Sequence, residues 1–207
     1  MVEYEDYINN LSEIEKSALL ETFNIGASHA ATALYQMTGI ETSVSVPSIE
    51  IVPIKDVGEE FKDEVKVAVY VELGKEFDGH IFFITDFQDA LKICGLMLGT
   101  NECSELDELG KSSIMEMGNI LASAFATAIS NFLGITIDQT PPQMVIDFLP
   151  AIIDLALIDI AKYSEYTILL KTDIKLGETL FEEHLLVFPR IDGMKAILKK
   201  LKEVLGC

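Results

Sequence analysis

The chain has 207 residues, of which 49% are hydrophobic, so it is long and apolar enough to bury a sizeable core. Its formal net charge is −19 with only 15 lysines and arginines, which argues against a nucleic-acid or anionic-membrane partner. Arg190 is the only arginine, so no arginine cluster exists to clamp a phosphate group.

The sequence predicts a cytoplasmic protein without membrane insertion. Its N-terminus has no basic region followed by an apolar stretch, as a signal peptide would have. The most apolar segment, 148–161, contains Pro150 and two aspartates and is shorter than a membrane span. The three cysteines form an odd count without paired spacing, which is typical of a reducing compartment: Cys94, Cys103 and Cys207.

The first half of the chain opens with a long predicted helix from residue 12 to about 38. Ser12 and Glu15 form a capping-box signal at its start, and Gly39 is a stop signal. Alternating and apolar runs then predict strands, and a final periodic run predicts a second helix. These elements are expected at 42–52, 65–73, 79–85 and 86–99.

The second half repeats this order after an acidic linker. Ser104 with Asp107 offers a helix start, so a helix is predicted over 104–133, ending at Gly134. The pattern then predicts a strand, an apolar helix, two strands and an amphipathic helix at the C-terminus. These elements are expected at 135–146, 148–161, 166–176, 180–188 and 191–206.

The two halves are related in sequence. Laying 17–52 over 112–147, an offset of 95 without gaps, gives 13 identities in 36 positions. This self-similarity predicts one domain, residues 1–207, made of two repeats at about 10–100 and 104–206.

Four polar residues recur on one face of each long helix. Ser17, Glu21, Asn24 and Ser28 stand at i, i+4, i+7 and i+11, and the second helix repeats the pattern with Ser112, Glu116, Asn119 and Ser123. For one copy, a solvated surface face would be the simpler interpretation. The pattern occurs twice, and each copy has a proline 23 residues after the asparagine, at Pro47 and at Pro142. This repetition favours a function instead.

A glutamate–asparagine pair lacks a strong nucleophile, a histidine base and the charge density that binds a metal. The asparagine amide donates and accepts hydrogen bonds at once, so it can hold a water molecule without taking its proton. An exposed glutamate can pair with a cation supplied by another protein. The pattern therefore suits completion of a partner's active site.

The spacing [Asp/Ser]-x3-Glu-x2-Asn-x22-Pro resembles the motif of the CheC/CheX/FliY family of chemotaxis phosphatases. The first motif in this chain consists of Ser17, Glu21, Asn24 and Pro47, and the second motif consists of Ser112, Glu116, Asn119 and Pro142. The resemblance covers essentially the whole chain, and the doubled motif is specific.

The resemblance implies hydrolysis of the aspartyl phosphate of a phosphorylated CheY-type response regulator. The receiver domain of that partner brings the acyl phosphate, Mg²⁺ and a lysine, so no cofactor of the chain's own is expected. Asn24 or Asn119 would place the attacking water, and Glu21 or Glu116 would pair with the receiver's lysine. That is a positioning and electrostatic task.

The resemblance also implies an α+β fold, in which two long helices lie side by side on an antiparallel sheet with pseudo-twofold symmetry. A second implied partner is the deamidase CheD. The apolar segment 148–161 is a candidate docking surface for CheD, and a plain core helix is an equal alternative.

Two departures from the family pattern fall in the first motif. Phe23 precedes Asn24, whereas Gly118 precedes Asn119 as is common in the family, and His29 stands where asparagine is frequent. Phe23 either limits the approach of a partner or packs inward.

The main rival function is a non-enzymatic module, either a CheD-binding regulator or a docking protein of the flagellar switch, for which loss of the Glu–Asn pairs would be typical. A metal-dependent phosphatase is disfavoured because no Asp/His ligand cluster is evident.

Overall fold

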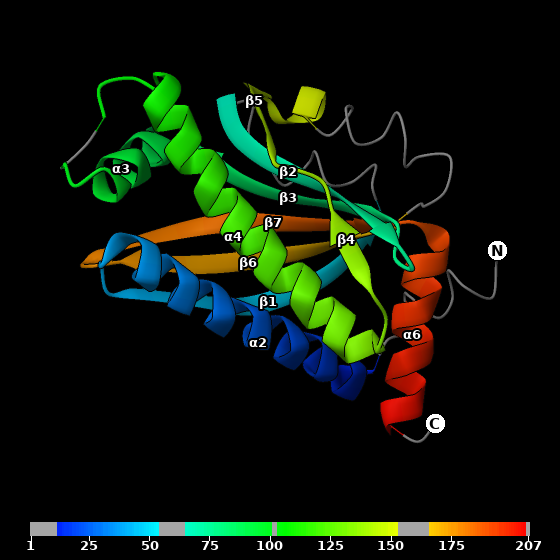
Figure 1. Ribbon diagram of the computed structural model, residues 1–207. Coiled ribbons are helices and arrows are strands. Elements are labelled where there is room, and N and C mark those ends of the chain that lie inside the picture. Colours follow the sequence, from blue (N-terminus) through cyan, green and yellow to red (C-terminus); the bar gives the residue numbers. More distant parts are fainter. Residues whose placement is uncertain (1–11, 54–64, 101–102, 153–165, 206–207) are drawn as a thin grey trace.

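A computed structural model describes residues 12–53, 65–100, 103–152 and 166–205 of the chain. Two long helices, two shorter ones and a set of strands make up these parts (Figure 1). In chain order the elements are α2 (Glu13–Thr38), β1 (Thr42–Pro53), β2 (Val65–Lys75), β3 (Gly79–Asp86), α3 (Phe87–Met97), α4 (Glu108–Leu133), β4 (Ile137–Gln139), β5 (Gln143–Phe148), β6 (Tyr166–Leu176), β7 (Thr179–Pro189) and α6 (Ile191–Leu205).

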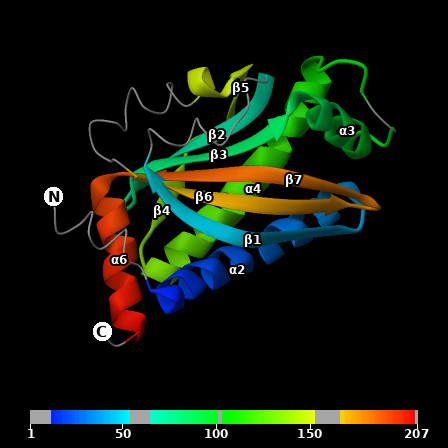
Figure 2. The ribbon, with the colours of Figure 1, turned by 180° about the vertical axis from the view of Figure 1, so that it is seen from behind.

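The described strands form one seven-stranded antiparallel sheet in the order β1-β6-β7-β3-β2-β4, with β5 also paired to β2. Helices α2 and α4 lie side by side on one face of this sheet and run in opposite directions (Figure 1). In the view from behind, the sheet lies in front of both helices (Figure 2). The predicted α+β class with two long helices on an antiparallel sheet is confirmed.

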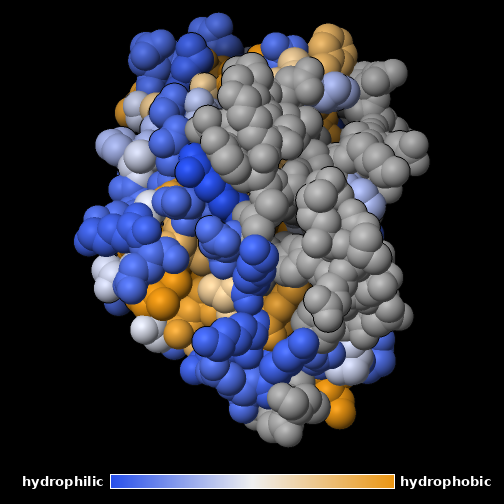
Figure 3. All heavy atoms as spheres, turned by 90° about the vertical axis from the view of Figure 1, so that its right-hand side faces the viewer, coloured by the Kyte–Doolittle hydropathy of each residue, from blue (hydrophilic) through white to orange (hydrophobic). Residues whose placement is uncertain are grey.

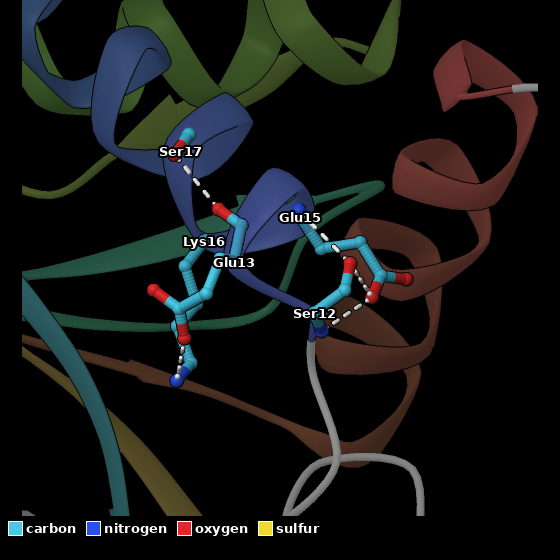
Figure 4. Close-up of polar contacts among 5 residues, drawn as sticks. All are labelled: Ser12, Glu13, Glu15, Lys16 and Ser17. Carbon is cyan, nitrogen blue, oxygen red and sulfur yellow. Dashed lines mark hydrogen bonds and ion pairs between the residues drawn. The ribbon is translucent and has the colours of Figure 1, made fainter.

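The two long helices have matching ends. Each has 26 residues and stops at a left-handed glycine, Gly39 at φ 69° and Gly134 at φ 70°. Helix α2 begins with the predicted capping box, in which Glu15 N–H donates to Ser12 Oγ and Ser12 N–H donates to the Glu15 carboxylate (Figure 4). The predicted start of the second helix at 104 is wrong. Asp107 is the N-cap, because its side chain accepts from the N–H of Gly110.

Each motif proline lies at an irregularity of an outer strand. In β1, Val46 and Pro47 lie between Ser45, which faces Asp173, and Ser48, which faces Lys171, so β1 has one residue more than β6 there. The single strand predicted at 135–146 is instead split into β4 and β5, again with one residue more than the facing strand β2. Proline has no N–H to donate to a neighbouring strand, which accounts for both interruptions.

The outer strands cross between the halves. Strand β1 of the first half pairs with β6 of the second, and β4 and β5 of the second half pair with β2 of the first. Neither half therefore completes its own sheet. At the centre, β3 and β7 pair about Phe82 and Leu186, and α3 and α6 follow these two strands directly. This arrangement supports the duplication, which stays a prediction.

The hydrophobic core has two parts, one on each face of the sheet. Alternate residues of β3 point to opposite faces: Ile81 and Phe83 join the larger cluster beneath α2 and α4, and Phe82 and Ile84 join a smaller cluster on the other face. The smaller cluster includes Leu149, from a helical turn at residues 149–152. From the side on which α6 lies, polar side chains border part of an apolar area of the surface (Figure 3).

The fold bears on the cysteines and on the predicted apolar helix. The cysteine count gave no sign of a disulfide, but Cys94 of α3 and Cys103 are disulfide-bonded and link α3 to the segment before α4. Their spacing of nine residues has no signature of its own, and the fold brings them together.

Of the predicted helix 148–161, Phe148 ends β5, and everything after residue 152 lies outside the described residues. In the parts of the chain that the structure describes, no helix has the length and apolarity needed to span a membrane.

Candidate functional site

The serine, glutamate and asparagine of each motif lie on a surface of the long helix that points away from the core. In the first motif Ser17 and Glu21 are exposed and Asn24 is half-buried. In the second motif Ser112 and Glu116 are exposed and Asn119 is half-buried, as in the first. The structure thus gathers the predicted glutamate and asparagine on one accessible face in each half.

The motif serines are bonded within their own helices. Ser17 Oγ donates to the carbonyl oxygen of Glu13 at 2.7 Å (Figure 4), and Ser112 Oγ donates to that of Glu108 at 2.8 Å. Each hydroxyl proton is therefore donated within the helix, so toward a partner the two serine oxygens can only accept hydrogen bonds.

The motif glutamates have no such bonds. Among the described residues, neither Glu21 nor Glu116 has a hydrogen-bond or ion-pair partner. An exposed and unpaired carboxylate can take a cation from another molecule without breaking an internal contact. The described part of the chain also has no group of three His, Cys, Asp or Glu side chains placed to hold a metal ion.

Asn24 of the first motif is bonded to the backbone of β1. Its Oδ1 accepts from the N–H of Val46 at 3.0 Å, and its Nδ2 donates to the carbonyl oxygen of Val46 at 3.2 Å. The same Nδ2 also donates to the carbonyl oxygen of Leu20 at 3.1 Å. The amide therefore holds α2 and β1 together at the irregularity of the strand.

Val46 presents its backbone to Asn24 because β1 is out of register there. The ladder between β1 and β6 is interrupted between Ser45 and Ser48, so Val46 has no paired position on β6. Val46 is buried, so a backbone N–H and C=O without partners would be costly there, and the Asn24 side chain satisfies both.

Asn119 of the second motif is held differently. An offset of 95 places Pro141 at the position of Val46, and a proline has no N–H to donate. Asn119 Oδ1 instead accepts a long hydrogen bond of 3.4 Å from Nε2 of Gln139, which also donates to Ser123 Oγ. No described residue accepts a hydrogen bond from Asn119 Nδ2.

The residues before the two asparagines both face the interior. Phe23 is 1% exposed and packs against Phe125, with ring centroids 6.0 Å apart. A Cβ atom at Gly118 would lie 2.5 Å from Val69 Cβ, so only glycine allows α4 to approach β2 this closely. Of the two alternatives for Phe23, the structure shows inward packing.

Sequence reasoning missed three residues that shape these sites: Val46, Gln139 and Pro141. The same offset of 95 that revealed the motifs aligns Val44 with Gln139 and Val46 with Pro141. These differences between the halves were therefore visible. Their meaning was not, because it depends on which backbone groups the sheet leaves unpaired.

A separate polar cluster is formed by side chains of β2, β3 and β7. Glu183 is buried and accepts from Thr85 Oγ1 at 2.7 Å, and Lys66 forms an ion pair with Asp86 nearby. Burial raises the pKa of Glu183 well above its ordinary value, and Asp89 and Asp86 raise it further, while Thr85 and Lys66 lower it. Neither motif contains any of these residues.

The chain matches known proteins over both its sequence and its fold. Residues 109–146 match the model of the CheC-like family. The CheY-P phosphatase CheC of Bacillus subtilis is 24% identical over 93% of this chain and 96% of that protein. The CheC1 protein of Halobacterium salinarum is 32% identical over 58% of this chain and 63% of that protein.

Solved structures show the same fold. The crystal structure of Thermotoga maritima FliY is 25% identical, with a TM-score of 0.75 over 94% of this chain and 98% of that one. The middle domain of FliM from H. pylori has a TM-score of 0.65 at 9% identity, over 92% of this chain and 99% of that domain, which is a likeness of fold alone.

Proposed function

Because the chain belongs to the CheC-like family, we propose that it is a phosphatase that hydrolyses the aspartyl phosphate of a phosphorylated CheY-type response regulator. The similar proteins named CheY-P phosphatases support this activity. The retained Glu–Asn pair on an accessible helix face supports the same activity from the chain's own residues.

The second motif supplies the chemistry in this proposal. Asn119 holds a water molecule in line with the phosphorus atom, and Glu116 pairs with the lysine of the receiver. The receiver supplies the phosphoryl group, its own Mg²⁺ and that lysine, so the chain adds no cofactor. Orientation of the water and placement of charge are the two contributions that phosphoryl transfer needs from such a helper.

The observation that carries the proposal is the free state of the second motif. Among the described residues, the exposed Glu116 has no hydrogen-bond or ion-pair partner, and the amide nitrogen of Asn119 has no acceptor. Both groups lie one helical turn apart on α4, so they reach the same partner surface together.

The test is the decay of a phosphorylated CheY-type receiver, followed by release of inorganic phosphate. We expect the wild-type chain to accelerate the decay and a variant with both Asn24→Ala and Asn119→Ala to lose the acceleration. Asn131→Ala is the matched control, because Asn131 is an exposed asparagine of α4 outside the motif. A double variant as active as the wild type would overturn the proposed site.

A second candidate function is a non-enzymatic docking module, including a regulator that binds CheD. The likeness of fold to FliM favours it, since FliM of H. pylori has been solved in a FliG–FliM complex. Retention of both Glu–Asn pairs speaks against it. Binding of purified CheD without any acceleration of receiver dephosphorylation would favour the module over the phosphatase.

A further inference from the structure

We propose that the two motifs are not equivalent. The second motif is the working site, and Asn24 of the first motif is a structural clamp, a side chain that holds the irregularity of β1 against α2. The residue that decides between these states is the one before the motif proline, Val46 in the first half and Pro141 in the second. The inference rests on the proposed phosphatase function and assigns it to one of the two motifs.

The hydrogen-bonding capacity of Asn24 is almost fully used. An asparagine side chain has two N–H donors and one carbonyl oxygen with two lone pairs. Nδ2 of Asn24 donates to the carbonyl oxygens of Leu20 and Val46, at 3.1 and 3.2 Å, and its Oδ1 accepts from Val46 N–H at 3.0 Å. No donor and one lone pair remain for a water molecule.

The orientation of this amide is fixed by the backbone. An N–H can only donate, so the atom of Asn24 that faces Val46 N–H must be the oxygen. Turning the amide toward a partner would break the bonds to Val46 and leave an N–H and a C=O of β1 without partners. Recruiting Asn24 for catalysis would therefore disrupt the contact between α2 and β1.

The second half lacks this constraint. Pro141 has no N–H, so the bond that would correspond to Val46 N–H with Asn24 Oδ1 cannot form. Asn119 is bonded only to the exposed side chain of Gln139, at 3.4 Å, among the described residues. Gln139 stands where the first half has the buried Val44, so the neighbouring group at the second site is a polar side chain and not an apolar one.

Two measurements on the full chain distinguish the structural role of Asn24 from the catalytic role of Asn119. The first is the acceleration of phosphoryl loss from the receiver, and the second is the melting temperature. We expect Asn119→Ala to lower the acceleration about 100-fold without changing the melting temperature. We expect Asn24→Ala to keep the acceleration within about twofold and to lower the melting temperature by about 2–6 °C.

A second matched pair guards against a variant that fails to fold. Glu21 and Glu116 occupy equivalent, exposed positions. Among the described residues neither has a hydrogen bond or ion pair that its loss would remove from the fold. We expect Glu116→Ala to lower the acceleration at least tenfold and Glu21→Ala to leave it within about twofold, with no shift in melting temperature for either.

The outcomes separate the two proposals. A wild-type chain that does not accelerate the decay overturns the proposed function itself. An active wild type in which the variants of each pair reduce the rate equally, or in which Asn24→Ala reduces it at an unchanged melting temperature, overturns the assignment to the second motif alone.

Discussion

Gln139 donates a hydrogen bond to the side-chain amide of Asn119, and it illustrates how one side chain can separate two otherwise similar sites. Its Nε2 donates to both Asn119 Oδ1 and Ser123 Oγ. We expect Gln139→Val, which copies Val44 of the first half, to lower receiver dephosphorylation about three- to tenfold, because the Asn119 amide loses the group that orients it. The rate constant at saturating receiver should fall while the half-saturating concentration stays unchanged.

The matched control for this prediction is Gln143→Val. Gln143 is also an exposed glutamine of the same outer edge, but its side chain accepts from the hydroxyl of Tyr70 and has no hydrogen bond to Asn119. An equal loss of rate in both variants would show that the edge as a whole, and not the contact with Asn119, matters.

Glu183 makes stability depend on pH. Burial raises its folded pKa, so the folded protein keeps a proton that the unfolded chain releases above the ordinary glutamate value of 4.5. Stability therefore falls as pH rises from that value toward the folded pKa, by roughly 1 kcal/mol for each pH unit. We expect Glu183→Gln, which still accepts from Thr85, to raise the melting temperature at pH 8 and to have little effect near pH 4.

The control for this pH dependence is Glu182→Gln, at the exposed neighbour of Glu183. Its melting temperature should follow that of the wild type at every pH. A stabilisation by Glu183→Gln that is equal at pH 4 and pH 8 would contradict the assignment to the buried carboxyl group.

Among the helices, α4 depends on one close approach. A Cβ atom at Gly118 would meet Val69 Cβ at 2.5 Å, and Val69 is buried in the middle of β2. We expect Gly118→Ala to destabilise the protein by about 1–3 kcal/mol in urea unfolding, despite the better helix propensity of alanine. Gly74→Ala is the control, since nothing lies within 4 Å of its Cβ position. A Gly118→Ala variant as stable as Gly74→Ala would mean that α4 has room to move away from the sheet.

The elements were predictable where the signal is local. The capping box of Ser12 and Glu15 and the stop at Gly39 lie within or next to their own helix, and both were read correctly from sequence. The start of α4 was placed too early, because Ser104 and Asp107 offer alternative caps and the sequence does not rank them. The split between β4 and β5 depends on pairing with β2, which is distant in the chain.

At the scale of the whole molecule, the crossing of the outer strands joins the two halves. Strand β1 has its only described partner strand, β6, in the other half. We expect an isolated chain of residues 1–102 not to fold as a monomer, because β1 would expose an unpaired sheet edge and the apolar side chains beneath it. Sedimentation and far-ultraviolet circular dichroism check this. A folded monomeric half would contradict the interlocked arrangement.

The sites were only partly predictable from sequence. The residue types and their spacing identified both motifs, because helical periodicity places Glu116 and Asn119 on one face whatever the rest of the fold does. The bonds of Asn24 to Val46 were not predictable in the same way, since they form across 22 residues and require the interruption in the β1–β6 ladder. Local spacing thus predicts which groups a site contains, and the long-range pairing decides whether those groups are free.

The most direct test is whether one molecule of the chain dephosphorylates many molecules of phosphorylated receiver. Phosphorylated CheY-type receiver is mixed with the wild-type chain at about one-twentieth of its concentration, and inorganic phosphate is measured with time. We expect many molecules of receiver to be dephosphorylated per molecule of chain, at a rate well above spontaneous decay. Phosphate release at the spontaneous rate, or an effect that stops after one equivalent, would contradict this expectation and leave a binding module.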